Sequence, residues 1–310
     1  MSLSINTNFA AVQASHNLAQ NNELLMKSMQ RLASGKRIID TSDDAGGLAI
    51  AMKLNSAIEK LKGVSSNIKN SVSFLDVQDG IMQGAAGILE RMSELKSLSQ
   101  DVLKNTADIN TYNTEFQNLQ VQLYQMSKEK FNGISLFATT TEATGGTSAV
   151  FGNNNSSTDN TITIFTTEGG SSGPMVSVHK ALLLSAITFD QNNVSISKAF
   201  GASNTKTLAV SVSGNAKTLA DFTTSFFTQA IENVATLRAQ NGGSMSRLDF
   251  AQTNLDRTRA NLEASYGQIM DVDIAEESTR LAKYQILVQA ASSMLSQANM
   301  MPNTAMMLLG

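Results

Sequence analysis

Apolar side chains recur at seven-residue spacing over much of both ends of the chain. A sustained heptad of this kind indicates a long helix that packs along another long helix. Between residues 47 and 104 two such columns overlap, namely Leu54, Leu61, Ile68, Leu75, Met82 and Leu89, and then Phe74, Ile81, Ile88, Leu95 and Val102. The columns shift face along the helix, as expected where the packing partner changes. We therefore predict one long helix over 47–104.

A second helix is predicted directly downstream of this one. Apolar residues keep three-four spacing from Ile109 to Met126, so the helix starts near Thr106 and ends before the FNG turn at 131–133. The connection to the first helix is short, which makes the two antiparallel.

A third helical segment is predicted over 222–269 by another heptad column, which consists of Phe227, Val234, Asn241, Leu248, Leu255, Leu262 and Ile269. Asn241 is its one polar member. Gly242 and Gly243 follow it and weaken the helix by about 1 kcal/mol each relative to Ala.

The middle of the chain has a different pattern. Residues 139–160 are almost all Ser, Thr, Asn, Gly and Ala, which predicts a loop. Residues 161–179 alternate around a Gly-rich turn and predict a β-hairpin. Two further short strands are expected at 193–200 and 207–214. The fold class is therefore mainly α, a long antiparallel helical or coiled-coil hairpin with a small β-rich segment in the middle.

Both extremities carry apolar stripes but almost no charge. Residues 286–310 have no ionisable side chain, and residues 1–22 have only His16. The C-terminal stripe comprises Leu281, Tyr284, Leu287, Val288, Ala291, Met294, Leu295, Ala298 and Met301, and the N-terminal one Phe9, Val12, Leu18, Leu25, Met29 and Leu32. The C-terminal helix is expected to begin at a capping box of Asp273 and Glu276.

The faces opposite these stripes carry Ser, Asn and Gln instead of Lys and Glu. A helix with one face in water normally fills that face with charge, whereas an uncharged polar face tolerates burial because it can still hydrogen-bond. One N-terminal and one C-terminal helix cannot cover both sides of each other, but many copies packed side by side can. We therefore expect the ends to be disordered in the isolated chain and to fold on polymerisation.

The composition argues against nucleic-acid binding, membrane insertion and thiolate metal sites. A net charge of −3 and a pI near 5.5 leave no basic patch for nucleic acid. Gln and Ser interrupt the C-terminal apolar run well short of the roughly 20 residues of a membrane span, so no membrane insertion is expected. The absence of Cys excludes disulfides and thiolate metal sites, and no cleavable secretory signal is evident at the front.

No arrangement of side chains predicts an enzyme, a metal site or a cofactor. His16 and His179 lack metal-ligand spacing. Asp271, Asp273, Glu276 and Glu277 form an acidic cluster without the twelve-residue loop that holds calcium, and helix capping explains it better. Asp43 and Asp44 are expected to form a turn and a helix N-terminus instead of a catalytic pair.

The stretch RLASGKRIIDTSDDAGGLAI, residues 31–50, resembles the N-terminal signature of bacterial flagellins, the subunits of the flagellar filament. SINTNFAAVQASHNLAQNN at the front, FNGISLF at 131–137, NLEASYGQIMDVDIAEE at 261–277 and ILVQAASSMLSQANMMP at 286–302 resemble the same family in the same order. The resemblance leaves the middle of the chain unmatched.

The resemblance implies a hairpin-shaped subunit whose termini form the inner layer of a tube. The implied segments are an N-terminal inner helix and spoke at 1–46, helical body at 47–138 and 222–269, a variable segment at 139–221, and a C-terminal spoke and inner helix at 270–310. The spoke and signature residues would be Arg31, Gly35, Arg37, Asp43, Asp44, Gly47, Asp271 and Asp273. Ile39, Gly46 and the run Tyr266, Gly267, Gln268 depart from the family pattern, so the contacts between subunits do not carry over.

The resemblance also implies partners and a location outside the cell. The partners would be many identical subunits, an export chaperone, the flagellar type III apparatus that passes the unfolded chain, and the filament cap and junction proteins. Arg91 and Leu95, with Gln122 where the family has Glu, would match contacts for the Toll-like receptor that senses flagellin. The alternative within the same class is a hook-filament junction protein or another flagellar axial protein.

Overall fold

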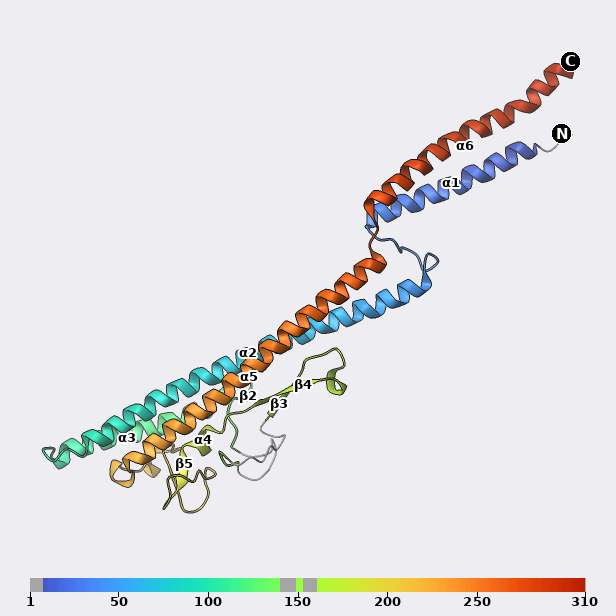
Figure 1. Cartoon of the computed structure of the whole chain (residues 1–310). Coiled ribbons are helices and arrows are strands. Elements are labelled where there is room, and N and C mark those ends of the chain that lie inside the picture. The colour runs from blue at the N-terminus through green and yellow to red at the C-terminus, as the bar shows by residue number, and fades with distance from the viewer. Residues whose placement is uncertain (1–7, 140–148, 153–160, 310) are drawn as a thin grey trace. The chain divides into compact units, whose positions relative to one another are not determined.

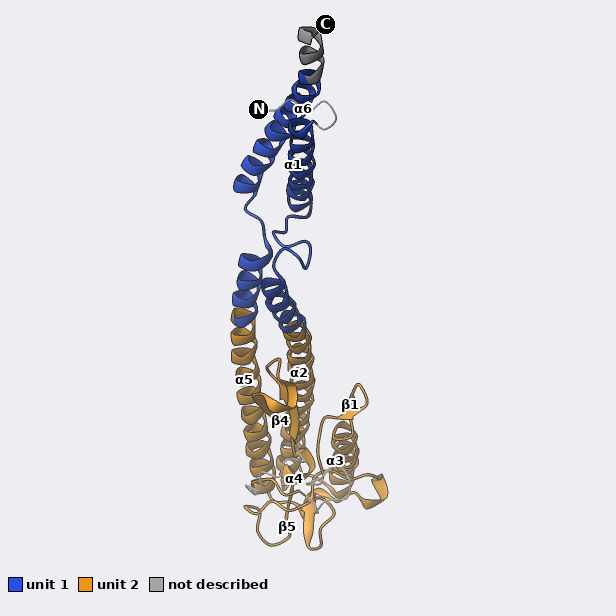
Figure 2. Cartoon of the chain, turned by 90° about the vertical axis from the view of Figure 1, so that its right-hand side faces the viewer, with its two compact units in different colours: residues 1–59, 258–310 blue, residues 60–257 orange. Residues whose placement is uncertain are grey.

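The computed structural model describes residues 8–139, 149–152 and 161–309, with residues 302–309 described by their backbone alone. Its helices are α1 (Phe9–Ser34), α2 (Ala45–Leu98), α3 (Thr106–Met126), α4 (Leu183–Ala186), α5 (Thr224–Met270) and α6 (Ile274–Leu309) (Figure 1). Its strands are β1 (Lys130–Phe131), β2 (Ile134–Ser135), β3 (Thr161–Phe165), β4 (Met175–His179), β5 (Thr188–Asp190) and β6 (Thr205–Thr207). The chain forms two compact units, residues 1–59 with 258–310, and residues 60–257 (Figure 2).

In the first unit α1 and α6 pack side by side and antiparallel (Figure 1). The Asn8 amide donates to the Ala298 carbonyl at 2.7 Å, and the Ser28 hydroxyl donates to Glu277 at 2.5 Å. From Asn8 to Ser28 the position on α1 advances by 20 residues, while the partner on α6 moves back by 21, from Ala298 to Glu277. The two helices are therefore antiparallel. The predicted helices at both ends are confirmed.

Both helices of this pair start at side-chain caps. Asn8 accepts from the Ala11 amide at 3.2 Å, and Asp273 accepts from the Ala275 and Glu276 amides at 2.9 and 3.2 Å. The predicted Asp273 cap is confirmed. The Glu276 carboxylate pairs with Arg280 at 2.5 Å, one helical turn on.

In the second unit α2 and α5 run antiparallel, with α3 folded back along α2. The Asp79–Arg238 and Ser65–Gln252 contacts, at 3.0 and 2.8 Å, fix this direction. Asn241, the polar member of the third heptad column, is 5% exposed and donates to the Leu75 carbonyl at 2.9 Å. The helix continues through the two glycines that follow it.

The core of the second unit consists of the predicted heptad positions of α2 and their partners. Leu61, Ile68, Leu75, Met82, Leu89 and Leu95 are all buried. The prediction that the helix reaches residue 104 is wrong, because α2 ends at Leu98 and Val102 is 96% exposed. The polar SQD run closes the helix, and Asn105 with Asp108 forms a capping box at the start of α3. The predicted start near Thr106 is confirmed.

A cluster of edge-on aromatic rings attaches the β-rich segment to α3 and α5. Phe116 lies 5.6 Å from Phe222, which lies 5.0 Å from Phe226, which in turn lies 4.7 Å from Phe189 of β5. The Asn233 amide of α5 adds a hydrogen bond of 2.8 Å to the Ala186 carbonyl of α4.

The β-rich segment is only partly as predicted. The hairpin over 161–179 is confirmed as β3 and β4, which pair Thr161 with His179 and Phe165 with Met175. The strands predicted at 193–200 and 207–214 are wrong, since the pairing lies instead between β5 and β6. Most of the predicted loop over 139–160 lies outside the described residues.

The two strands predicted at 193–200 and 207–214 fail for different reasons. Asn193 accepts from the Ser195 amide at 3.0 Å, a side-chain turn that competes with a strand. Leu208 and Ala209 are fully buried, and the Val210 amide donates to the Gln120 carbonyl of α3 at 3.2 Å. The apolar alternation of that segment therefore reflects packing onto a helix and not pairing in a sheet.

We predict that Asn241→Leu raises the free energy of unfolding by about 1–2 kcal/mol. The Asn241 amide oxygen is buried and unpartnered among the described residues, and a buried unsatisfied group costs about that much. Urea denaturation followed by circular dichroism measures the change. The exposed neighbour Gln240→Leu serves as the control and should stay within about 0.5 kcal/mol of the parent. A destabilised Asn241→Leu protein would show that the amide holds the helices together.

Candidate assembly surface

A polar joint connects the ends of the long helices within the first unit. Gly35, in the left-handed region with φ of 68°, ends α1. The two connecting segments then pair as in an antiparallel ribbon, since the Val272 amide donates to the Gly35 carbonyl at 3.1 Å and the Arg37 amide donates to the Met270 carbonyl at 2.6 Å. Lys36 faces Asp271 between these bonds.

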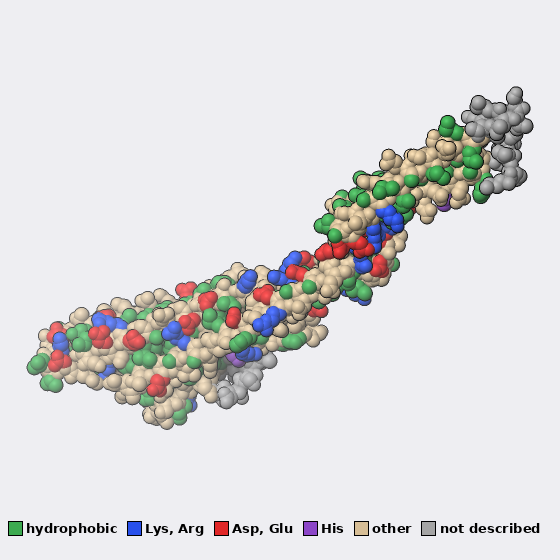
Figure 3. Space-filling model, turned by 45° about the horizontal axis from the view of Figure 1, so that its top comes forward, with side chains coloured by type: hydrophobic (Ala, Val, Ile, Leu, Met, Phe, Trp, Pro, Cys, Tyr) green, Lys and Arg blue, Asp and Glu red, His purple; other side chains and the backbone are tan. Residues whose placement is uncertain are grey.

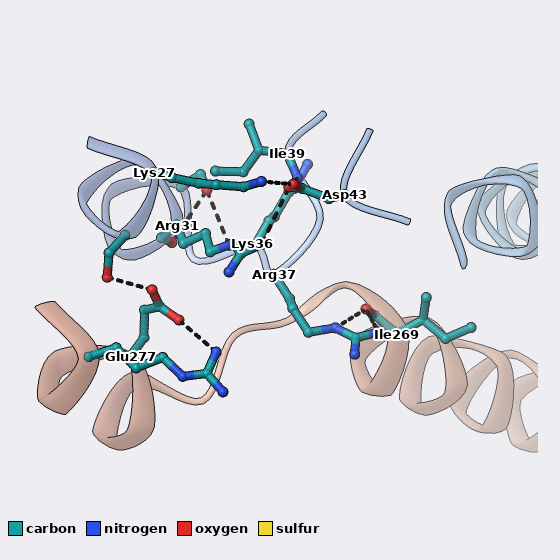
Figure 4. A network of polar contacts seen from close by, with 11 residues as sticks. Lys27, Arg31, Lys36, Arg37, Ile39, Asp43, Ile269 and Glu277 are labelled. Carbon is teal, nitrogen blue, oxygen red and sulfur yellow. Dashed lines mark hydrogen bonds and ion pairs between the residues drawn. The ribbon is translucent and has the colours of Figure 1, made fainter. Parts of the chain in front are cut away.

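Arg37 closes the C-terminus of α5. Its Nε and Nη2 atoms donate to the Ile269 carbonyl at 3.2 and 2.9 Å (Figure 4). The last carbonyls of a helix lack partners within the helix, and a cation there also meets the negative end of the helix dipole. Arg37 therefore satisfies one of these carbonyls and attaches the N-terminal connecting segment to the C-terminal one.

Asp43 is the anionic centre of the joint. Its side chain is 3% exposed and pairs with Lys27 of α1, with Arg31 of the same helix 3.6 Å away (Figure 4). The hydrogen bond from Lys27, helped by the Ile39 amide at 3.3 Å, lowers the pKa of Asp43 to about 2 against the opposing effect of burial. The carboxylate thus stays charged and holds the connecting segment against α1.

Asp44 and Gly47 form the start of α2. The Asp44 carboxylate accepts from the Gly47 amide at 2.8 Å. A Cβ atom at Gly47 would clash with that carboxylate and lie 3.0 Å from the Ile38 side chain. Ile38 packs with Ala51 and Met270 in a small apolar cluster beneath the joint. The signature residues of the sequence therefore meet in one place, with Asp273 at the adjoining start of α6.

A buried pair between α1 and α6 was missed from the sequence. Ser28 and Glu277 are 2% and 3% exposed, and their bond of 2.5 Å joins the two helices. Arg280 lies 3.6 Å from the same carboxylate. The signal was present, because Ser28 follows Leu25 by three positions and precedes Leu32 by four, and so lies on the apolar stripe of α1.

The apolar side chains of α1 and α6 divide into two sets. An inner set is half-buried between the helices and consists of Leu18, Leu25, Leu32, Leu281, Leu287, Val288 and Leu295. An outer apolar set stays largely exposed and consists of Phe9, Val12, Met26, Met29, Ile286, Met294, Met300 and Met301. Figure 3 shows apolar and uncharged polar atoms along this pair, with charged side chains gathered near the joint. The pair thus presents an apolar outer surface with little charge.

The residues matched to receptor contacts do not form one surface. Arg91 is exposed and pairs with Glu115 of α3 at 2.8 Å and with Glu94 at 2.7 Å, and these carboxylates raise its pKa. Leu95 is fully buried, so it offers nothing to a partner in this fold. Gln122 is exposed, and the carboxylate beside Arg91 belongs to Glu115. The match of Gln122 to the family's Glu stays a prediction.

The described part of the chain contains neither a metal-binding group of side chains nor a membrane-spanning helix. Within residues 8–139, 149–152 and 161–309 no group of three His, Cys, Asp or Glu side chains is placed to hold an ion. No helix among these residues has the length and apolar content to cross a membrane.

Two family models and several proteins match this chain. The bacterial flagellin N-terminal helical region matches residues 5–142, and the bacterial flagellin C-terminal helical region matches residues 224–309. Flagellin of Listeria monocytogenes is 29% identical, over 97% of both chains. Flagellin of Bacillus subtilis is 28% identical and the flagellar filament 33 kDa core protein of Treponema phagedenis 26% identical, each over 98% of this chain and 99% of its own length. The crystal structure of Bacillus cereus flagellin aligns with 61% of this chain and 88% of its own, with a TM-score of 0.41 and 18% identity.

We predict that the joint weakens in acid over a defined range. Because the pKa of Asp43 is about 2 in the folded chain and 3.8 ordinarily, its stabilisation is complete above about pH 4 and is lost as the pH falls through 2. Asp43→Asn should weaken the joint by about 1 kcal/mol at pH 7, with a difference from the parent that vanishes near pH 2. Hydrogen exchange of peptides from the joint measures this, with the exposed Asp40→Asn as control. A difference that persists unchanged at pH 2 would contradict the assignment.

Proposed function

Since the chain belongs to the bacterial flagellin family, whose members are structural subunits of the extracellular flagellar filament, we propose that its copies assemble through the outer apolar set of α1 and α6. The exposure of this set is the observation that carries the proposal. Phe9 is 79% exposed, and Ile286 and Met294 are 67% and 65% exposed. Burying an aliphatic or aromatic side chain contributes about 1.5–3 kcal/mol.

The polar side chains between these residues support burial by further copies. Residues 286–301 of α6 carry Gln, Ser and Asn but no charge. Moving a charge out of water between packed helices would cost far more than moving an amide or hydroxyl that finds a hydrogen-bond partner. A surface that is apolar and uncharged over several helical turns is therefore suited to contact with copies of itself.

The charged joint gives the assembly its geometry in this proposal. Lys27, Arg31 and Asp43 fix the connecting segment to α1, and Arg37 fixes it to the end of α5. The joint would then set where α1 ends relative to the start of α6, so that the pair formed on assembly has one arrangement. Arg31, Gly35, Arg37, Asp43, Asp44, Gly47, Asp271 and Asp273 serve this positioning.

Passage through the flagellar type III apparatus as an unfolded chain is part of the proposal. The chain has no Cys, so no disulfide would resist unfolding, and an isolated helix pair with half-buried contacts is marginal in water. The Met-rich end of α6 is adaptable apolar surface, which fits a shielding export chaperone before assembly and neighbouring copies afterwards. The filament cap and junction proteins would meet the same ends.

Substitution of the outer apolar set tests the assembly. Ile286→Gln and Met294→Gln introduce a good helix former but remove an apolar side chain from the proposed contact. Each substitution should therefore raise the critical concentration for polymerisation by about tenfold. Sedimentation and electron microscopy measure the polymer. Val212→Asn, 59% exposed in the second unit, is the control and should polymerise as the parent does. Equal polymerisation of all variants would refute the role of the set.

Deletion of residues 286–310 gives the all-or-none version of this test. Polymer should vanish while circular dichroism still shows the helices of the second unit and the same cooperative melting. Ordinary filaments from the truncated chain would exclude assembly through α6.

Hydrogen exchange tests the expected coupling of folding to assembly. Amides of α1 and α6 should exchange orders of magnitude faster in the dissociated chain than in the filament, because a marginal helix pair opens frequently. Amides of α2 and α5 near Leu75 and Asn241 should be protected in both states. Equal protection of α1 and α6 in the dissociated chain would mean that the pair folds without neighbours.

A further inference from the structure

Methionine is the commonest residue of the outer apolar set of α1 and α6. Seven methionines of the described chain are exposed, and the exposed fractions of those in the outer set lie between 50% and 65%. The five methionines of the outer set are Met26, Met29, Met294, Met300 and Met301. The other two exposed methionines are Met52 in the first unit and Met175 in the second. Exposed thioethers are therefore concentrated on the surface through which copies are proposed to assemble.

The methionines of the outer set occur toward both ends of the helix pair. Met26 and Met29 are three residues apart and lie near the joint, toward the end of α1. Met294 and Met301 are seven residues apart in the later half of α6, on either side of Ala298, whose carbonyl accepts from α1. Residues at these spacings share a helix face. A neighbouring copy that covers either end of the pair would therefore bury methionine.

The sulfur of an exposed methionine reacts with hydrogen peroxide. Its lone pair attacks one peroxide oxygen, so that an S–O bond forms as the O–O bond breaks. A proton passes from the transferred OH group to the departing hydroxide, which leaves as water. The sulfur loses two electrons, the peroxide gains them, and the thioether becomes a sulfoxide. The chain contains no Cys and no Trp, so no thiol or indole of the same chain competes for the oxidant.

Oxidation would make this surface polar where burial is needed. A thioether is apolar, whereas a sulfoxide is a polar group that accepts hydrogen bonds. The neighbouring apolar members of the outer set, such as Phe9 and Ile286, offer it no donor. A polar group that is buried without a hydrogen-bond partner opposes the contact that buries it. A copy with sulfoxides on α1 and α6 is therefore a poor partner for another copy.

We propose that the five methionines of the outer set are oxidation sites through which peroxide reversibly prevents assembly. This inference rests on the proposed assembly through α1 and α6, and it adds a chemical modification and a reagent to that surface. The fold itself is spared, because Met82 and Met92 in the core of the second unit are fully buried.

Peptide mass spectrometry locates the sulfoxides after a brief treatment of the dissociated chain with hydrogen peroxide. The five methionines of the outer set should be oxidised at least about tenfold faster than Met82 and Met92, since a buried sulfur reacts only when the fold opens. Met52 and Met175, which are also exposed, should react as fast as the five. In filaments the five should be protected by neighbouring copies.

Sedimentation measures the effect on assembly. Oxidation of the five methionines should raise the critical concentration for polymerisation at least about tenfold. The two methionine sulfoxide reductases, one for each sulfoxide epimer, with a dithiol as reductant, should restore the parent value. The melting temperature of the second unit should stay unchanged, because Met82 and Met92 remain reduced. Recovery on reduction separates the effect of the sulfoxides from irreversible damage.

Leucine variants assign the effect to the outer set. Replacement of its five methionines by Leu keeps apolar volume and helix propensity, so this variant should polymerise as the parent does, both before and after peroxide. The matched control, Met52→Leu with Met175→Leu, removes the exposed thioethers outside the set. It should lose assembly after peroxide as the parent does.

Each other outcome overturns a definite part of the account. A parent chain that polymerises equally well after oxidation of the five methionines, or that does not recover on reduction, overturns the inference and leaves the proposed assembly standing. Loss of assembly after peroxide in the fivefold Leu variant also overturns it, because sulfur atoms outside the set would then be responsible. A parent chain that forms no filaments under any condition, or whose five methionines react equally fast in filaments and in the dissociated chain, removes the proposed function instead.

Discussion

Two helices can bury only one stripe of each against the other, and α1 and α6 carry more apolar surface than one shared stripe holds. The inner set, which includes Leu18 and Leu295, is half-buried where α1 and α6 pack against each other. The outer set, with Phe9 and Ile286 among its most exposed members, stays largely exposed in the single copy. Burial of apolar area is the main favourable term in protein association, so this excess supports the proposed assembly of copies. The flagellin family assignment supports the same proposal.

Charge is distributed in the opposite way to apolar surface. The ends are nearly free of it, whereas Lys27, Arg31, Arg37 and Asp43 gather within the joint. A buried charge needs a fixed partner and hydrogen bonds, and for that reason it specifies one geometry where an apolar contact tolerates several. In the proposed assembly, apolar contact would join the copies, whereas ion pairs fix the geometry of the joint within each copy.

The long helices were predictable from the sequence because the heptad is a periodic signal that extends over many residues. Thr106 as the start of α3 and the hairpin over 161–179 were also found, since caps and Gly-rich turns are local. Errors arose where tertiary contacts decide. Leu208 is apolar because it is fully buried directly after β6, outside any strand. The column through Val102 continues beyond the end of its helix.

At the candidate surface, sequence patterns located the residues but not their pairings. The charges of the joint could be named individually, yet nothing in the spacing shows that Arg37 reaches the Ile269 carbonyl more than 200 residues away. Ser28 lay on the apolar stripe and was passed over because one hydroxyl on such a stripe is common. Its buried partner Glu277 was counted with an acidic cluster that it does not join.

The Asn241 amide has a mechanical consequence for the second unit. A propeller shaft carries torque and tension, and both tend to shear one helix past its neighbour. The bond from Asn241 to the Leu75 carbonyl joins α5 to α2 within an otherwise apolar heptad column, and a slip of one heptad would break it and move the amide beside Ile68 or Met82. Sliding of α5 along α2 therefore has to break a buried hydrogen bond about halfway along both helices.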